Sequence, residues 1–89
     1  MAKYVVIGRY AEGAEERRKP FRDEHMARLQ GFKDAGRIVT LGPTKDFSTL
    51  VAILEAEGEA EAREVIEGDP YWKEGIWSEY ELHEWIQAF

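Results

Sequence analysis

The chain has 89 residues, no cysteine, and 18 acidic against 12 basic side chains, which gives a net charge of −6. This length predicts one small domain over residues 1–89, and the lack of cysteine excludes disulfides and thiolate zinc sites. A domain of this size buries only about 60% of its unfolded surface on its own. We therefore expect unusually good packing or a partner subunit.

The charge is divided unevenly, since residues 1–45 carry +4 and residues 46–89 carry −10. The positive side chains alternate with acids along a helical pattern, so we expect no nucleic-acid partner. No apolar run approaches the about 20 residues of a membrane span, and no signal-peptide pattern precedes the first strand, so we expect a cytoplasmic protein without a membrane partner. Asparagine is absent and glutamate abundant, a composition typical of thermophile proteins.

Segments typical of strands and helices alternate along the chain. Residues 3–10 are β-branched and aromatic and predict a strand, whereas residues 14–35 predict a long helix that Gly36 ends and whose packed part begins near Pro20. The further predicted elements are strands at 37–43 and 49–56 joined by a five-residue hairpin loop, a helix at 59–67 with Ala60, Val65 and Ile66 as its apolar stripe, a turn at 71–75, and a strand at 76–86. This order predicts an α+β, ferredoxin-like βαββαβ fold, a four-stranded antiparallel sheet with two helices on one face.

Both faces of the predicted sheet are apolar, although the helices cover only one. In the third strand Val51 and Ile53 point to one face while Leu50 and its alternate neighbours point to the other, and the last strand has Trp77 and Trp85 on one parity. We therefore expect a homodimer in which sheet packs on sheet across a two-fold axis. The alternative is a monomer whose helices and C-terminal segment cover both faces.

His25 lies on the inward face of the first predicted helix. Phe21, His25, Leu29 and Phe32 recur at helical spacing, which places the imidazole on the stripe that faces the protein. Such a histidine is either a core side chain satisfied by one hydrogen bond or a general acid or base, and its position alone leaves both open.

Arg18 and Arg22 precede His25 by about two turns and one turn of helix. Together with the free N–H groups of the helix start, they predict a seat for an anion. The alternative is that these arginines pair with surface acids, namely Glu15, Glu16 and Glu24.

Asp69 follows the helix-ending Gly68 and precedes Pro70. An aspartate in this position ordinarily caps the next turn. A carboxylate held beside a histidine also fixes its tautomer and strengthens it as a base, so Asp69 is a candidate partner of His25 if the fold brings the two together.

The remaining candidates have weaker signals. Gly42 and Pro43 end the second strand or line a ligand site, and Tyr71 lines a pocket or packs in the core. His83 and its neighbours Glu81 and Glu84 could hold a metal, but we expect a histidine that is exposed or at an interface. We expect no metal and no cofactor, and the sequence lacks a phosphate-binding glycine loop and a nucleophile elbow. RNA binding through the sheet is also not expected, because the strand 49–56 lacks stacking aromatics.

These residues together resemble the YCII-related (YciI-like) family of the dimeric α+β barrel superfamily. The resemblance spans nearly the whole chain and rests on the order of four features: Arg22, His25, the Gly42-Pro43 pair and the Asp69-Pro70 pair. It implies a ferredoxin-like protomer, a homodimer that closes a barrel from two sheets, and an active site in which His25 pairs with Asp69. The family has no established reaction as a whole, whereas superfamily relatives include isomerases, lactone-forming and lactone-opening enzymes, monooxygenases and dehalogenases.

Two features depart from the family pattern. The loop at 44–48 is shorter than in several members, and His83-Glu84-Trp85 stands where members often have a proline and an aromatic residue. Neither departure touches the predicted site. We therefore predict a small enzyme of isomerase, lyase or hydrolase type that uses His25 and Asp69 in acid–base chemistry on an anionic substrate held by Arg18, Arg22, Gly42, Pro43 and Tyr71. The alternative is a non-catalytic dimeric ligand-binding or scaffold module.

Overall fold

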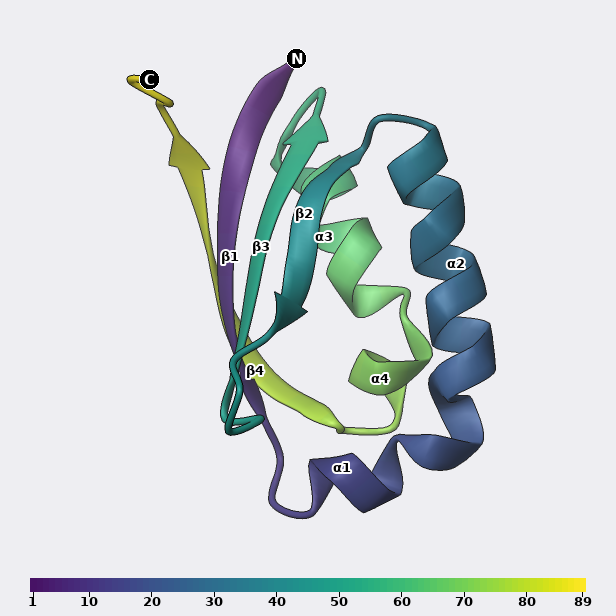
Figure 1. The fold of residues 1–89 in the computed structure, drawn as a ribbon. Coiled ribbons are helices and arrows are strands. Elements are labelled where there is room, and N and C mark those ends of the chain that lie inside the picture. The colour runs from purple at the N-terminus through teal and green to yellow at the C-terminus, as the bar shows by residue number, and fades with distance from the viewer.

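A computed structural model describes residues 1–89 and confirms the predicted fold class (Figure 1). Its elements are β1 (Ala2–Tyr10), α1 (Ala14–Arg17), the 3-10 turn η1 (Lys19–Phe21), α2 (Arg22–Asp34), β2 (Ile38–Pro43), β3 (Thr49–Ala56), α3 (Glu59–Glu67), α4 (Pro70–Lys73) and β4 (Trp77–Trp85). None of the helices has the length and apolar character that crossing a membrane requires.

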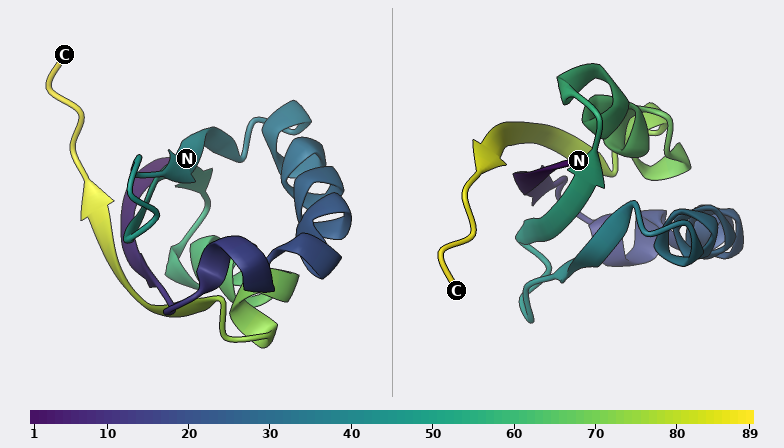
Figure 2. Two further views of the ribbon diagram at one scale, coloured as in Figure 1. Left: turned by 60° about the horizontal axis from the view of Figure 1, so that its bottom comes forward. Right: turned by 90° about the horizontal axis from the view of Figure 1, so that it is seen from above.

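The four strands form one antiparallel sheet in the order β2-β3-β1-β4. On the central strand β1, Val6 lies between Ala52 of β3 and Leu82 of β4, which fixes the register of the sheet. All helices lie on one side of this sheet, and the chain beyond β4 extends away from the body (Figure 2). The protomer thus has the ferredoxin-like architecture with one sheet face covered and one uncovered.

The first helical segment is broken rather than continuous. The chain forms α1, passes through η1, which contains Pro20, and only then enters α2 at Arg22. Proline has no N–H to donate and is tolerated only in a first turn, so the break falls where the sequence places Pro20. Beyond α2, Gly36 takes the left-handed backbone conformation with φ of 76°, as predicted for a residue that ends a helix.

The predicted turn after Asp69 is a short helix, α4, because Pro70 at its first position fits a helical start. In α3 the buried stripe consists of Ala62, Val65 and Ile66, whereas Ala60 is exposed. The prediction that Ala60 belongs to the apolar stripe was therefore wrong. The alanine that faces the sheet is Ala62, two positions later.

The core fills the space between the helices and the covered sheet face. Its fully buried large side chains come from the sheet, from α3 and α4, and from the turn just before β4: Val6, Leu50, Leu54, Val65, Ile66, Tyr71, Ile76 and Trp77. The expectation that Trp77 and Trp85 share a face was wrong. The pairing of β1 with β4 shifts register between Arg9 and Tyr10, and this irregularity turns Trp77 into the core while Trp85 stays half exposed.

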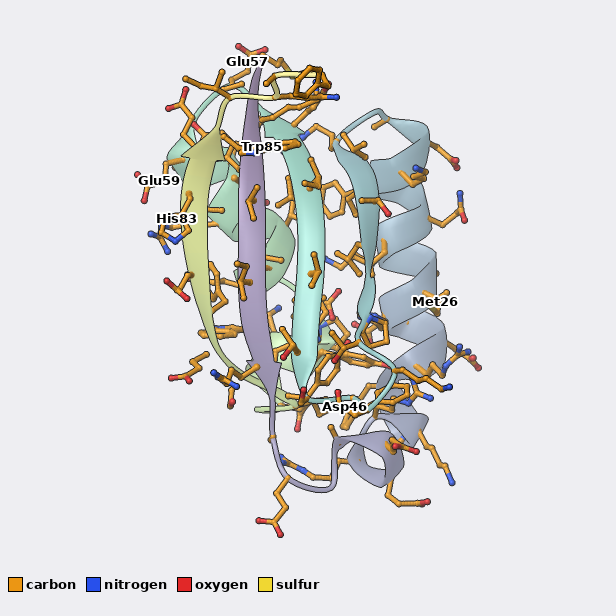
Figure 3. The ribbon with its side chains drawn as sticks, turned by 60° about the vertical axis from the view of Figure 1, so that its left-hand side comes forward. Met26, Asp46, Glu57, Glu59, His83 and Trp85 are labelled. Atoms are coloured by element: carbon orange, nitrogen blue, oxygen red, sulfur yellow. The ribbon has the colours of Figure 1, made fainter.

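The uncovered face has an apolar centre, as the alternation of residues predicts. Val5 and Ile7 of β1 pair with Ile53 and Val51 of β3, and no helix lies over them. Figure 3 looks onto this face, with β4, β1, β3 and β2 side by side and Trp85 at the upper end. We call the four side chains Val5, Ile7, Val51 and Ile53 the open-face strip.

Candidate functional site

His25 and Asp69 are in direct contact beneath the helical layer. The Nδ1 atom of His25 on α2 lies 2.7 Å from Oδ1 of Asp69, which precedes α4. The two residues are 5% and 0% exposed. The fold thus brings together two residues 44 positions apart in the chain.

Asp69 reaches this position through the turn chemistry expected of it. Gly68 ends α3, Asp69 takes an extended backbone conformation, and its Oδ1 accepts the backbone N–H of Tyr71 at 2.9 Å as the cap of α4. The two interpretations of Asp69, helix cap and histidine partner, therefore both hold, since the same oxygen serves both.

Arg28 is the third member of the cluster, and no sequence motif pointed to it. Its Nη1 donates to Oδ2 of Asp69 at 3.2 Å and to the backbone oxygen of Val65 at 2.8 Å, and its Nη2 donates to that of Glu64 at 2.9 Å. The only available signal was its spacing of three residues from His25, which places both on one face of α2.

The hydrogen bonds around Asp69 assign the tautomer of His25. Oδ1 of Asp69 accepts from the Tyr71 backbone and Oδ2 from the Arg28 guanidinium, which is the set of contacts that an ionised carboxylate makes. The nitrogen that faces it, Nδ1, must then carry the proton. In the neutral imidazole the lone pair is then on Nε2, which has no hydrogen-bond partner in the protein.

His25 also lines a cavity of about 530 Å³ between α2 and β2. All five predicted substrate-contacting residues line it with His25: Arg18, Arg22, Gly42, Pro43 and Tyr71. Asp69 does not reach the cavity and lies behind the imidazole. The remaining walls, which the sequence did not single out as a pocket, are Tyr10, Met26, Leu29, Gln30, Lys33, Ile38, Thr40, Leu41 and Phe47.

The positive charge in this cavity is not neutralised by the protein. Neither Arg18 nor Arg22 forms an ion pair, so the predicted alternative of pairing with Glu15, Glu16 or Glu24 was wrong. Glu16 pairs instead with Lys19. The Nε atom of Arg18 is buried without a hydrogen-bond partner.

Phe47 holds the Arg18 guanidinium in place from the loop between β2 and β3. The guanidinium carbon lies 4.5 Å from the centre of the phenyl ring, within the range of a cation–π contact. Phe47 has a positive φ of 58°, which is rare for a bulky residue and marks a strained position at this end of the cavity.

Two tyrosines supply neutral hydrogen-bond donors to the cavity wall. Burial raises the pKa of Tyr71 above its ordinary value, and the nearby Arg18 and Arg22 cations oppose this only in part. Burial likewise raises the pKa of Tyr10. Both side chains therefore keep their protons at neutral pH.

The second histidine belongs to a different region. His83 is exposed on β4 (Figure 3) and its Nε2 lies 3.3 Å from Glu81. No group of three histidine or acidic side chains gathers anywhere in the chain as a metal site would require.

Comparison with known proteins places this chain in a group of similar small proteins. The model of the YCII-related domain matches residues 2–86. Protein YciI of Escherichia coli O6:H1 and of Shigella flexneri are each 27% identical to the chain over 96 residues, covering 97% of it and 98% of the relative.

Two solved structures share the fold. One is 5-chloro-2-hydroxyhydroquinone dehydrochlorinase (TftG) of Burkholderia phenoliruptrix AC1100 in complex with 2,5-dihydroxybenzoquinone, with a TM-score of 0.82, 24% identity, and coverage of 97% of this chain and 95% of that one. The other is a NIPSNAP domain protein of Burkholderia xenovorans, with a TM-score of 0.58, 16% identity, and coverage of 99% and 95%. The family match over residues 2–86 shows that this chain belongs to the YCII-related family.

Proposed function

We propose that this protein is a small acid–base enzyme in which Nε2 of His25 takes a proton from, or returns one to, an anionic organic molecule in the cavity. The observation that carries this proposal is the 2.7 Å contact between His25 and Asp69, which leaves Nε2 as the unpaired nitrogen of a cavity-lining histidine. Asp69 holds the tautomer and balances the imidazolium that forms when Nε2 takes a proton.

The charge that develops on the substrate has partners at the same end of the cavity. Removal of a proton from carbon leaves an electron pair that delocalises onto an adjacent oxygen, and stabilising this oxyanion lowers the barrier. Arg18 and Arg22 are unpaired cations and Tyr71 is a protonated phenol, so all three fit this role. Isomerisation and elimination both begin with such a step.

The rest of the cavity indicates the body of the substrate. Away from the arginines the walls are mixed: Met26 and Leu29 on α2 and Ile38 and Leu41 on β2 are apolar, and the polar residues among them are Gln30, Lys33 and Thr40. Two arginines near His25 and a partly apolar wall beyond them fit an organic acid whose anionic head lies near His25. The ligand named in the TftG structure, 2,5-dihydroxybenzoquinone, is a ring compound with acidic oxygens, and we propose this class as the first to test.

We also propose that the working unit is a cytoplasmic homodimer joined through the open-face strip. Ile7 and Val51 are each 43% exposed in the single chain, although they lie at the centre of a sheet. Ion pairs stand at the margin of the strip, between Lys3 and Glu55 and between Arg9 and Glu79. An apolar centre with a charged rim fits a second copy of the chain. The cytoplasmic location stays a prediction from the sequence.

A deuterium-exchange assay tests the acid–base role and does not require the product to be identified. Small keto acids, hydroxylated aromatic acids and hydroxyquinones are incubated with the protein in D₂O, and loss of C–H signals is followed by proton NMR. His25→Ala and Asp69→Asn are expected to slow enzyme-dependent exchange by about 10²- to 10⁴-fold, the usual contribution of a positioned acid or base. The matched control is His83→Ala, which removes the exposed histidine and is expected to leave exchange unchanged.

The same assay separates the enzyme from a ligand-binding module. A compound that binds in the cavity, seen as shifted resonances of His25, but exchanges no faster than in buffer for any class tested would favour the non-catalytic alternative. Exchange that persists in His25→Ala would refute the proposed role of this histidine.

A further inference from the structure

We propose that Arg28 is the positioning residue of the site: it orients the Asp69 carboxylate and, through it, keeps His25 in the tautomer that leaves Nε2 unpaired. Arg28 does not line the cavity and touches no group that a substrate could reach, so it acts only through Asp69. The inference rests on the proposed function for its catalytic meaning, although its geometry and its test do not involve a substrate.

Arg28 is anchored before it reaches Asp69. Its two terminal nitrogens donate to the backbone oxygens of Glu64 and Val65 at 2.9 and 2.8 Å. These carbonyls belong to the last turn of α3, where the helix dipole favours a cation. The Glu64 oxygen also accepts the backbone N–H of Gly68 at 2.9 Å, so it is shared between Gly68 and Arg28. The Arg28 guanidinium also lies 4.8 Å from the centre of the Phe32 ring. The guanidinium fork of Arg28 is therefore held by two backbone oxygens and by the Phe32 ring.

The anchored fork determines how the carboxylate is turned. Oδ1 of Asp69 serves two donors, His25 Nδ1 and the Tyr71 backbone, whereas Oδ2 has Arg28 as its only partner. A fully buried carboxylate that loses one of its donors is under-satisfied and is free to turn toward another arrangement. The bond from Arg28 to Oδ2 thus keeps Oδ1 aimed at His25.

Gly68 makes room for this arrangement. A Cβ atom built on Gly68 would lie 2.5 Å from Nη2 of Arg28 and 2.9 Å from the backbone oxygen of Glu64. Its φ of −81° is ordinary for any residue, so the need for glycine here is one of space. Gly68→Ala therefore displaces Arg28 without changing its charge, and provides a second and independent way to disturb the bond.

The test follows the hydrogen-bonded Nδ1 proton of His25 in protein with ¹⁵N-labelled histidine. In the native protein we expect a single tautomer by ¹⁵N shifts and a low-field Nδ1–H signal that exchanges slowly with water. Arg28→Met should remove this signal or make it exchange quickly with water, because Oδ2 of Asp69 loses its only partner. Arg28→Lys, which keeps the charge but not the fork, should have an intermediate effect.

The matched control is Arg63→Met, which removes an arginine of α3 that bonds Glu59 and Tyr80 and does not touch Asp69. Its Nδ1–H signal should equal that of the native protein. Unfolding in urea is measured in parallel, because a purely structural clamp would lower stability but leave tautomer and exchange rate unchanged.

The outcomes separate clearly. Loss or fast exchange of the signal in Arg28→Met and in Gly68→Ala, with the signal kept in Arg63→Met, supports the positioning role. A native signal in both of the first two variants overturns it, whatever their stability. If Arg28→Met does not fold, Gly68→Ala and Arg28→Lys decide the matter. Because no substrate is used, these results stand apart from those of the deuterium-exchange assay.

Discussion

The imidazole of His25 lies flat on the phenol ring of Tyr71, with ring centres 3.5 Å apart and planes inclined by 3°. Tyr71 is only 2% exposed, so its ring is a fixed platform beneath the histidine. The backbone N–H of the same residue donates to Asp69 Oδ1. Tyr71 therefore restrains both members of the His25–Asp69 pair, one by stacking and the other by capping.

This double role predicts different results for two substitutions of Tyr71. Tyr71→Phe keeps the ring and the backbone bond, so we expect a loss of less than about 1.5 kcal/mol in the free energy of unfolding. Tyr71→Ala empties a core position and should cost about 3–5 kcal/mol. Urea unfolding followed by tryptophan fluorescence measures both. Equal losses in the two variants would show that the hydroxyl, and not the ring, is what the core requires.

The architecture was predictable because each helix and strand is marked by a signal in its own stretch of sequence. The bounds of β3 and α3 agree with the predicted ranges at every residue, since Gly58 and Gly68 flank the helix and β-branched residues fill the strand. The contact between His25 and Asp69 was conceivable from the topology, since the fold places the end of α3 beside α2. Its catalytic meaning stays a prediction.

The parts that could not be predicted depend on long-range geometry. Arg28 reaches across to α3 and bonds mainly to backbone oxygens, which carry no sequence signal. Trp77 changes face because of an irregularity in strand pairing, which a simple count of alternate residues does not detect. The cation–π contact of Arg18 depends on the backbone of Phe47, a loop residue whose positive φ no propensity favours.

Asp69 is a buried charge with three donors, so its replacement should be costly in a way that depends on the new side chain. Asp69→Ala leaves Arg28 and His25 without their partner and removes the cap of α4, and we expect a loss of about 3–5 kcal/mol in the free energy of unfolding. Asp69→Asn keeps an oxygen for the Tyr71 N–H and should lose clearly less. Chemical denaturation of both variants at pH 7 checks this order, and a reversed order would contradict it.

Replacing glycine by alanine should change the free energy of unfolding in opposite directions at two positions. Gly31 lies within α2, and a Cβ there would meet nothing within 4 Å, so Gly31→Ala should stabilise the protein by about 0.5–1 kcal/mol through helix propensity. Gly68→Ala should destabilise it by about 1–3 kcal/mol, because the new methyl group overlaps Arg28 and the Glu64 oxygen. Thermal unfolding of the pair tests both signs, and a stabilised Gly68→Ala would show that Arg28 moves aside without cost.

Stability should fall at alkaline pH. Burial is the main cause that raises the pKa of all four tyrosines, Tyr4, Tyr10, Tyr71 and Tyr80, above their ordinary value. As pH rises past about 10, the unfolded chain loses these protons before the folded one does, so the free energy of unfolding decreases. Urea unfolding between pH 8 and 11, with tyrosinate absorbance as a second readout, follows this loss. Tyr10→Phe should reduce the slope, whereas a constant stability up to pH 11 would contradict the assignment.

The open-face strip predicts how the protein associates. Val51→Glu places a charge at the centre of the face where Ile7 and Val51 meet, which a sheet-to-sheet interface cannot bury without a large penalty. Size-exclusion chromatography with light scattering should show a dimer for the native chain and a monomer for this variant. Circular dichroism should be unchanged, because Val51 is 43% exposed within one chain and the helix-covered core is not altered.

The control for this experiment is Ala60→Glu, which adds the same charge to the exposed side of α3, far from the strip in the fold. It should remain dimeric, so that a change in net charge alone is excluded as the cause of dissociation. A native chain that is monomeric at micromolar concentration would overturn the proposed dimer. The open-face strip would then be exposed to solvent. Dissociation of both variants would instead assign the association to long-range charge, because Ala60 and Val51 lie on opposite layers of the molecule.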